Sequence, residues 1–239
     1  MHDAPAKLTL SLRIGGVRPD GYHTIDAEMV TLEYGDRLEF GPGDGLEVTG
    51  PRAWGVPLSD ANLVRRALAA VGRAAHVRLE KRVPAGAGLG GGSADAAAVL
   101  RWAGCTDTAV AVGLGADVPF CLVGGRARVT GIGEVVEPLP FEERTFTLLL
   151  PPFGTVTSGV YRTWDHLGGP TVAQPDGNDL EPAVLAMAPE LKRWRDELGN
   201  ASGQTPRLAG SGSTWFVEGE FPGGGRIVTR TRPAFADVG

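Results

Sequence analysis

The chain has 239 residues, which is enough for one large domain or for two smaller domains that share an interface. Its net charge of −5 gives no basic field that would draw it to nucleic acid or anionic lipid, so local groups must bind any ligand phosphate. No apolar run approaches the roughly 20 residues that span a bilayer, and Met1 does not open a signal peptide. We therefore expect a cytoplasmic protein without nucleic-acid or membrane partners.

Two cysteines, Cys105 and Cys121, are too few for a disulfide framework, and no Cys/His spacing indicates a zinc site. The hydrophobic fraction of 42% and the charged fraction of 21% are typical of a soluble globular protein. The partner we expect is a small-molecule substrate. The composition is compatible with a monomer or a homodimer.

The first 49 residues predict a β-rich sheet. Alternation from Ala6 to Ile14 indicates a half-buried strand, with Leu8, Leu10, Leu12 and Ile14 on one face and Lys7, Thr9, Ser11 and Arg13 on the other. Turns are expected at Gly15-Gly16, Pro19-Asp20-Gly21 and Gly35-Asp36. Further strands are expected over Ala27–Tyr34, Arg37–Phe40 and Leu46–Thr49.

A packing helix is predicted over residues 60–73, because apolar residues recur there at helical spacing, and Ser59 or Asp60 is its expected cap. The next stretch, His76–Val83, alternates as a strand with Val77, Leu79 and Val83 on one face.

The segment Val83–Leu100, VPAGAGLGGGSADAAAVL, predicts a strand end, a glycine loop and the first turns of a helix. Its glycines let the backbone take positive φ values and approach a ligand closely. Ser93 stands at the expected N-cap, and alanines follow it. The helix would then direct its free N–H groups and positive dipole end into the loop, which favours a phosphate.

A flexible glycine-rich linker is the alternative for this loop. Linkers, however, are not usually followed at once by an alanine-rich helix or preceded by an alternating strand. The loop also lacks the Gly-Lys-Ser/Thr ending of a Walker A motif and the distal acidic residue of a Rossmann fingerprint. It therefore indicates a third kind of phosphate loop.

The segment PAGAGLGGGSADAAA resembles the ATP-binding motif of the GHMP kinases, and its triple glycine is most similar to the 4-diphosphocytidyl-2-C-methyl-D-erythritol kinase family. The resemblance implies a bound Mg²⁺ ion, with the Ser93 hydroxyl as one of its ligands. Asn62 matches a family position beside the nucleotide, but a purely structural role for this asparagine is equally compatible with the sequence. It also implies an ATP-binding loop made of Pro84, Ala85, Gly86, Ala87, Gly88, Leu89, Gly90, Gly91, Gly92, Ser93 and Ala94.

The segment PAKLTLSLRIGGVRPDGYHTI resembles the N-terminal motif of the same family. By that resemblance Lys7 is catalytic, and Tyr22 and His23 contact the cytosine base by stacking and hydrogen bonding. The family usually carries asparagine where this chain has Thr9, a candidate substrate contact with a shorter reach. Without the motif, Lys7 would be a solvated strand lysine, and Tyr22 and His23 a hairpin-end pair.

The segment LGADVPF places Asp117 between apolar residues and a proline, where burial of a carboxylate is costly. From the local sequence alone, a helix N-cap or a turn residue is one alternative for Asp117. The resemblance of Gly-Ala-Asp-Val-Pro to the family implies instead that Asp117 is the catalytic aspartate. The following GGRARVTGIGEVVEPL is an expected hairpin.

In the C-terminal part, Phe146–Leu150 is an expected buried strand, and the two prolines after it mark the expected domain crossing. Thr157 and Tyr161 match the family segment that closes over the cytosine. Asp179 is an expected helix cap. The segment RLAGSGST at residues 207–214 resembles the third GHMP motif.

Two further elements complete the chain. A helix is expected to start at Pro189 and to end at Gly199, with Leu191, Trp194 and Leu198 on its core face. A buried strand is expected from Trp215, and Arg226–Arg232 is an expected final edge strand.

Periodicity alone predicts only an α+β protein. The resemblance implies the two-domain GHMP kinase fold, with a ribosomal protein S5 domain 2-like β-α domain over residues 1–143 and a ferredoxin-like α/β sandwich domain over residues 144–239. The implied activity is ATP-dependent phosphorylation of the 2-hydroxyl of 4-diphosphocytidyl-2-C-methyl-D-erythritol, in the non-mevalonate isoprenoid precursor pathway.

Two alternatives stand beside this activity: a GHMP kinase with a phosphomevalonate- or homoserine-like acceptor, and a non-catalytic GHMP-fold protein that binds a ligand. The PDGYH and GADVP segments disfavour the first. The second is disfavoured because Lys7, Ser93 and Asp117 are all retained.

Overall fold

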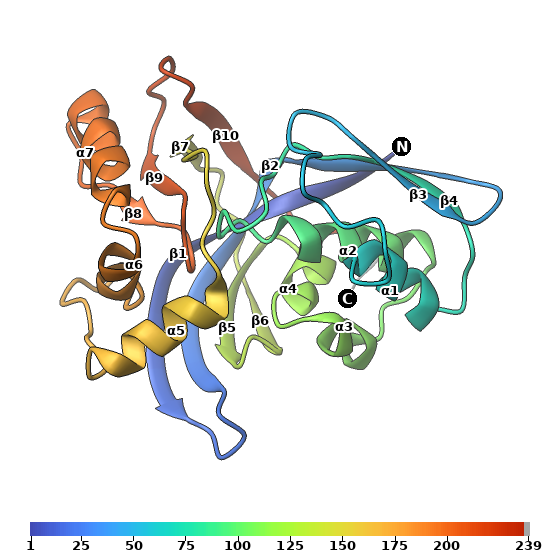
Figure 1. Ribbon diagram of the computed structural model, residues 1–239, viewed down its shortest axis with the longest axis horizontal. Helices are drawn as coiled ribbons and strands as arrows, with labels where there is room; N and C mark the ends of the chain where they lie inside the picture. The colour runs from blue at the N-terminus through green and yellow to red at the C-terminus, as the bar shows by residue number, and fades with distance from the viewer. Residues whose placement is uncertain (237–239) are drawn as a thin grey trace.

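A computed structural model describes residues 1–236 and shows a long mixed sheet with helices gathered beside both of its ends (Figure 1). The N-terminal half contains β1 (His2–Val17), β2 (His23–Gly41), β3 (Gly45–Thr49), α1 (Leu63–Ala70), β4 (His76–Glu80), α2 (Gly91–Trp102), α3 (Thr108–Leu114), α4 (Val118–Val123), β5 (Arg126–Gly131) and β6 (Val135–Leu139). The C-terminal half contains β7 (Thr145–Leu149), α5 (Thr157–His166), α6 (Glu181–Met187), α7 (Leu191–Ser202), β8 (Arg207–Leu208), β9 (Trp215–Glu218) and β10 (Ile227–Arg232).

Strand β2 is the centre of the sheet. It pairs antiparallel with β1 along most of its length, with β5 near its start and with β4 near its end. Strand β10 pairs with both β2 and β7, and so joins the N-terminal sheet to the β7–β9–β8 ladder. The prediction of an edge strand at Arg226–Arg232 is therefore wrong. The predicted domain division at residues 143 and 144 falls just before β7 and stays a prediction.

The side chains of β1 change faces within the strand. Leu8 and Leu10 lie in one core cluster, and Leu12 and Ile14 lie in the other. The pairing with β2 shifts register between Thr9 and Ser11, and such a bulge reverses the alternation. The prediction that all four apolar residues share one face is therefore wrong.

Three glycines that are predicted to form turns, Gly15, Gly16 and Gly35, lie inside strands instead. Strand β2 runs straight through Gly35, where a turn was predicted. A Cβ at Gly35 would lie 2.4 Å from the carbonyl oxygen of Ala4, so the glycine permits a close approach of two strands. Gly15 and Gly16 likewise lie inside β1, whereas Gly21 forms the expected turn with a φ of 83°.

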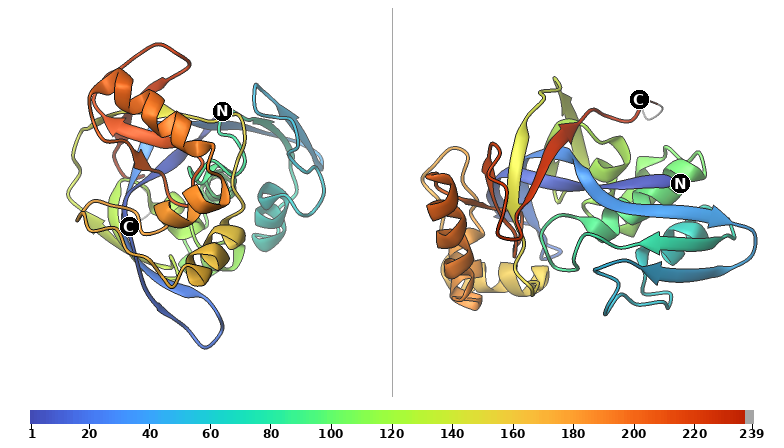
Figure 2. Two further views of the ribbon diagram at one scale, coloured as in Figure 1. Left: turned by 60° about the vertical axis from the view of Figure 1, so that its left-hand side comes forward. Right: turned by 90° about the horizontal axis from the view of Figure 1, so that it is seen from above.

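The helices of the N-terminal half pack against the sheet through small residues. Helix α2 buries a run of alanines against β1 and β2, and α1, α3 and α4 pack around it (Figures 1 and 2). Helices α5 to α7 lie at the opposite end of the molecule (Figure 2). Among the residues that the structure describes, no helix combines the length and the apolar character that a membrane crossing requires.

Several predicted helix ends are wrong. The N-cap of α1 is Asn62, whose side chain accepts a hydrogen bond from Val64 N, in place of Ser59 or Asp60. Helix α7 has Glu190 as its N-cap and Gly203 as its left-handed C-cap, so neither Pro189 nor Gly199 bounds it as expected. Ser59, Asp60 and Asn62 before α1 can all cap a helix, so the local sequence does not fix where this helix begins.

Asp179 does not cap the helix that follows it. The N-cap of α6 is Leu180, and the buried Asp179 carboxylate accepts hydrogen bonds from Ile14 N, Val172 N and Arg13 Nη1, at 2.9 to 3.0 Å. This carboxylate therefore ties β1 to the C-terminal half of the chain.

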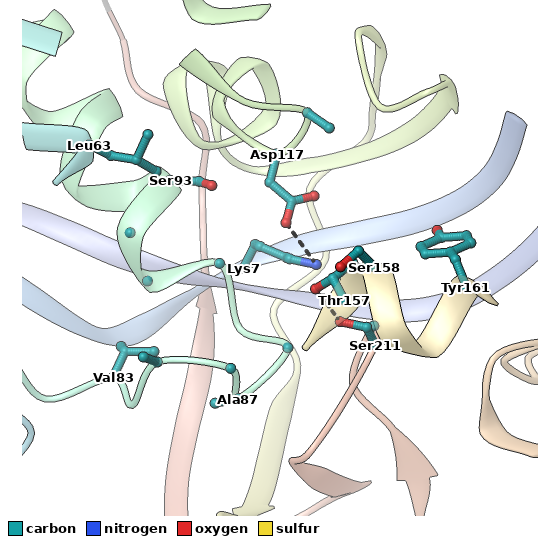
Figure 3. A pocket seen from close by; sticks show the side chains of 18 of the residues that line it. Lys7, Leu63, Val83, Ala87, Ser93, Asp117, Thr157, Ser158, Tyr161 and Ser211 are labelled. Carbon is teal, nitrogen blue, oxygen red and sulfur yellow. Dashed lines mark hydrogen bonds and ion pairs between the residues drawn. The ribbon is translucent and has the colours of Figure 1, made fainter. Parts of the chain in front are cut away.

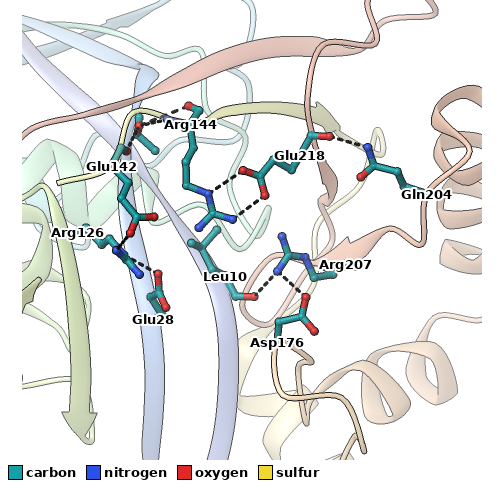
Figure 4. Close-up of polar contacts among 10 residues, drawn as sticks. Leu10, Glu28, Arg126, Glu142, Arg144, Asp176, Gln204, Arg207 and Glu218 are labelled. Carbon is teal, nitrogen blue, oxygen red and sulfur yellow. Dashed lines mark hydrogen bonds and ion pairs between the residues drawn. The ribbon is translucent and has the colours of Figure 1, made fainter. Parts of the chain in front are cut away.

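Ion pairs run along the junction of the two halves (Figure 4). Arg126 on β5 pairs with Glu28 on β2 at 2.8 Å and also with Glu142. Arg144 makes two parallel bonds to Glu218 on β9, at 2.7 and 2.8 Å. Partly exposed pairs add little stability individually, but bidentate geometry fixes the relative position of β7 and β9.

The close approach at Gly35 predicts a specific loss of stability. Gly35→Ala should lower the free energy of unfolding by about 1–3 kcal/mol, because the new methyl group overlaps the Ala4 carbonyl and two paired strands must separate. Gly16→Ala is the matched control, since no atom lies within 4 Å of its added Cβ. Urea unfolding of both variants tests this, and equal losses would show that the approach of β1 and β2 is not tight.

Candidate active site

A cleft of about 960 Å³ is lined by residues from both halves of the chain. Its walls come from β1, the segment before α1, the glycine loop, the start of α2, the turn before α4, α5 and residues 210–211 (Figure 3). Both predicted catalytic residues, Lys7 and Asp117, line this cleft together with most of the predicted phosphate loop.

The glycine loop takes the predicted left-handed conformation at three positions. The φ angles of Gly86, Gly88 and Gly90 are 69°, 76° and 64°. A Cβ at Gly88 would lie 2.0 Å from Ala209 O, and one at Gly90 would lie 2.7 Å from the Lys7 side chain. Both conformation and space therefore require glycine here.

The C-terminal half holds this loop through its backbone. The carbonyl oxygen of Gly86 accepts hydrogen bonds from Thr155 N and Ser213 N, at 2.9 and 3.1 Å. The carbonyl oxygen of Ala87 accepts one from Thr214 N at 3.2 Å. The segment at residues 207–214 thus contacts the predicted phosphate loop directly.

Helix α2 begins earlier than expected. Its N-cap is Gly90, in the left-handed region, and no side chain caps its first turn. Ser93, the predicted N-cap, is the third residue of the helix, so its hydroxyl faces the cleft instead of capping (Figure 3). The uncapped N–H groups of this turn are available to donate hydrogen bonds to an anion.

Two residues of the predicted loop support it from behind. Leu89 is fully buried, and its carbonyl oxygen accepts a hydrogen bond from Lys7 N at 3.0 Å. Ala94 is also buried, in the core beneath α2. Neither of them lines the cleft; Pro84, Ala85 and the remaining loop residues do.

Lys7 and Asp117 form an ion pair at the centre of the cleft, with 3.4 Å between Nζ and Oδ2. Lys7 is buried, whereas the Asp117 side chain is one-third exposed. Asp117 occupies the N-cap position of α4, but its side chain makes no capping hydrogen bond and points to Lys7 (Figure 3). The capping alternative for Asp117 is therefore not realised.

Thr9 lies beneath Lys7. Its hydroxyl accepts a hydrogen bond from Lys7 Nζ at 3.0 Å, and the residue is only 1% exposed. It does not line the cleft, unlike Lys7 itself. Its observed contact therefore orients the ammonium group.

Three aromatic rings lie at the other end of the cleft. The His23 ring packs against Tyr161 with 4.9 Å between centroids, and its Nε2 lies 2.7 Å from Asp165 Oδ1. Burial raises the pKa of Tyr161 to about 12, so its phenol stays neutral. Tyr22 lines the rim and is 60% exposed. Thr157 lies nearer to the loop, 2.9 Å from the Ser211 hydroxyl.

Several lining residues were not predicted from the sequence. On α5, Ser158, Arg162 and Asp165 share the face that carries Thr157 and Tyr161. Their spacing of three to four residues is a helical signal, which would have found them had a helix been expected here. Ser211, Lys81 and Asp95 also line the cleft.

The acidic and histidine side chains of the cleft do not form a metal cage. Across residues 1–236 there is no group of three or more His, Cys, Asp or Glu side chains that could hold an ion by itself. A divalent cation at this site would need oxygen atoms from a bound ligand or water.

Comparisons with known proteins agree with this geometry. Residues 61–125 match the GHMP kinases N terminal domain. The 4-diphosphocytidyl-2-C-methyl-D-erythritol kinase of Cereibacter sphaeroides is 39% identical over 89% of this chain and 87% of that protein. The protein of the same name from Paracoccus denitrificans is 38% identical over 89% of this chain and 84% of that protein. The chain belongs to this kinase family.

Solved structures support the same assignment. The crystal structure of a 4-(cytidine 5'-diphospho)-2C-methyl-D-erythritol kinase has a TM-score of 0.75 and 31% identity, and it covers 96% of this chain and 98% of that one. A mevalonate kinase of L. major has a TM-score of 0.59 at 13% identity, over 97% and 95% of the two chains, which shows the fold alone. The predicted α+β GHMP kinase fold is confirmed.

The contact between Thr9 and Lys7 predicts an effect on turnover. Thr9→Val keeps the side-chain volume but removes the hydroxyl that orients the ammonium, so kcat should fall roughly 10- to 150-fold, in line with ~1.5–3 kcal/mol for a hydrogen bond to a charged group. Thr147→Val on β7 is the control, because among the described residues the partners of this buried hydroxyl are Gly219 O and Phe221 N, away from the cleft. Steady-state kinetics test the difference, and similar kcat values for both variants would contradict it.

Proposed function

We propose that this protein transfers the γ-phosphoryl group of ATP to the 2-hydroxyl of 4-diphosphocytidyl-2-C-methyl-D-erythritol, in the non-mevalonate isoprenoid precursor pathway. The observation that carries the proposal is the Lys7–Asp117 pair, which shares one cleft with a glycine loop and the uncapped start of α2. The family of the chain supports the choice of acceptor.

The phosphate loop binds the polyphosphate by backbone groups. The first N–H groups of α2 have no capping side chain, and the dipole of this 12-residue helix favours negative charge at its start. Glycine at positions 86, 88, 90, 91 and 92 lets phosphate oxygens approach the backbone. This arrangement suits ATP, which is the phosphoryl donor in the proposal.

Ser93 is the residue that would hold Mg²⁺, through its hydroxyl oxygen. It faces the cleft from the third position of α2, beside the N–H groups that bind phosphate (Figure 3). Magnesium prefers oxygen ligands and usually keeps several waters and phosphate oxygens, so one hydroxyl fits its chemistry. Bound there, the ion would neutralise charge on the phosphates.

Asp117 orients the acceptor hydroxyl and receives its proton. An alcohol is a far weaker acid than a carboxylic acid, so the proton moves late, as the bond to phosphorus forms. Lys7 stabilises the negative charge of the transferring group and keeps the Asp117 carboxylate in place. The Thr9 hydroxyl holds the ammonium group in that position.

The aromatic end of the cleft suits the cytidine diphosphate of the acceptor. Tyr161 and His23 offer faces for a pyrimidine, and the neutral Tyr161 phenol can donate a hydrogen bond. Arg162 lines the same end and can meet the diphosphate. Tyr22 at the rim completes the proposed base contact.

Substitution of the proposed base tests the reaction. Asp117→Asn should lower kcat by at least about two orders of magnitude while ATP binding is kept, since the amide cannot accept the proton. Asp107→Asn is the control, because Asp107 caps α3 and asparagine caps equally well. Turnover is measured with Mg²⁺, ATP and the cytidylated acceptor, beside mevalonate 5-phosphate and homoserine. Near-normal turnover of Asp117→Asn would remove the base role, and activity only on another acceptor would overturn the substrate.

Truncation of Tyr161 tests the cytidine end. Tyr161→Ala should raise KM for the cytidylated acceptor about tenfold or more and leave KM for ATP nearly unchanged, because the ring that packs against His23 is lost. Tyr161→Phe keeps the ring and separates stacking from the hydroxyl. Equal changes in both KM values would exclude Tyr161 from the cytidine site.

A further inference from the structure

A single acidic side chain holds the histidine at the aromatic end of the cleft. His23, at the start of β2, places its Nε2 2.7 Å from Asp165 Oδ1 on α5. The two residues are 142 positions apart and come from the two halves of the chain. Asp165 lines the cleft beside His23, yet the base contacts proposed above give it no role.

Helix α5 also fixes the plane of the His23 ring. Tyr161 packs against this ring, and Trp164 meets it edge-on with 5.6 Å between the ring centroids. Trp164 and Asp165 follow Tyr161 by three and four residues, and residues with this spacing share one face of a helix. Trp164 is itself buried, and its Nε1 donates a hydrogen bond to Pro170 O at 2.8 Å. Only 9% of the His23 side chain is exposed, so the ring has little freedom to turn.

The carboxylate decides which nitrogen of the ring carries the hydrogen. An ionised carboxylate only accepts hydrogen bonds, so Nε2 of His23 donates to Asp165. A neutral imidazole has one N–H group, and Nδ1 is then a bare acceptor. Within residues 1–236, Nδ1 has no hydrogen-bond partner, and His23 lines the cleft. Nδ1 is therefore the nitrogen that the site offers to a ligand.

An acceptor at this position can distinguish the two pyrimidines found in nucleotides. Cytosine carries an exocyclic amino group, which donates hydrogen bonds, where uracil carries a carbonyl oxygen, which accepts them. The Nδ1 acceptor can pair with the amino group, whereas it would meet the uracil oxygen with lone pairs opposed. A site with a fixed polar group rejects the wrong partner, because a polar atom is then left unpaired.

We propose that Asp165 is a positioning residue that makes this site specific for cytosine. It holds His23 in the tautomer whose Nδ1 accepts a hydrogen bond, and the site thereby favours cytidine diphosphate (CDP) over uridine diphosphate (UDP). Asp165 acts through His23, without a contact of its own to the base. The inference rests on the proposed cytidine end of the cleft and does not depend on phosphoryl transfer.

The test compares the binding of CDP and UDP by calorimetry at pH 8.5, with saturating ADP present to fill the phosphate loop. This pH lies above the range in which histidine side chains ordinarily gain a proton. Wild type should bind CDP roughly tenfold more tightly than UDP, which corresponds to about one hydrogen bond. In Asp165→Asn the ratio of the two Kd values should fall to nearly one, because an amide can accept from Nε2 or donate to it and so supports both tautomers.

A double substitution separates positioning from a merely structural role. In a His23→Ala background, Asp165→Asn should cause no further change in the ratio, because the carboxylate acts through the missing imidazole. Loss of folded protein cancels in the ratio, since both nucleotides are measured on the same variant. Asp196→Asn is the matched control and should keep the wild-type ratio: this carboxylate lies on α7 and pairs with Arg195, away from the cleft.

An unchanged ratio in Asp165→Asn would overturn the inference, and so would a wild type that binds CDP and UDP equally or binds neither. An effect of Asp165→Asn that persists without His23 would also overturn it, because Asp165 would then act on the ligand directly. The phosphorylation assay gives an independent result. Turnover of the cytidylated acceptor together with an unchanged ratio would overturn only this inference. A ratio that depends on Asp165, without any turnover, would overturn only the proposed phosphorylation.

Discussion

The structure depends on one tight crossing, where the backbone of the phosphate loop passes between β1, α2 and the C-terminal half. Side chains are excluded at Gly88 by Ala209 and at Gly90 by Lys7. Backbone hydrogen bonds from Thr155, Ser213 and Thr214 hold the loop from the C-terminal side. Because the same crossing brings Lys7 against Gly90, the position of this lysine and the shape of the glycine loop are set together.

Several residues of the candidate active site do not make the capping or strand contacts that are usual at their positions. Their side chains or N–H groups are therefore free to contact a ligand. Asp117 occupies an N-cap position but leaves the helix uncapped and pairs with Lys7. Gly90 opens α2 without a capping side chain, so the first N–H groups remain for a ligand. The bulge after Thr9 lets Lys7 and Leu12, which would alternate in a regular strand, line the same cleft. Such departures are expected where function competes with local stability.

Periodicity and motifs predicted most elements and the central residues of the site, since both signals are local. Lys7 and Asp117 were found in this way, and the structure brings them to 3.4 Å. The errors arise from long-range contacts. The glycine at 35 looked like a turn because the strand it meets is distant in sequence, and β10 looked like an edge because its neighbour β2 is nearly 200 residues earlier. The buried Lys81 donates hydrogen bonds to Asp36 and Asp95, which lie 45 and 14 positions away, and no periodic pattern reveals these contacts.

In the proposed function, an acidic chain binds a polyphosphate at a site that offers backbone dipoles more than basic side chains. The protein carries a net charge of −5, and the cations that line the cleft are few: Lys7, which is paired with Asp117; Lys81, which is paired twice; and Arg162. The helix start and the loop amides therefore supply much of the positive potential.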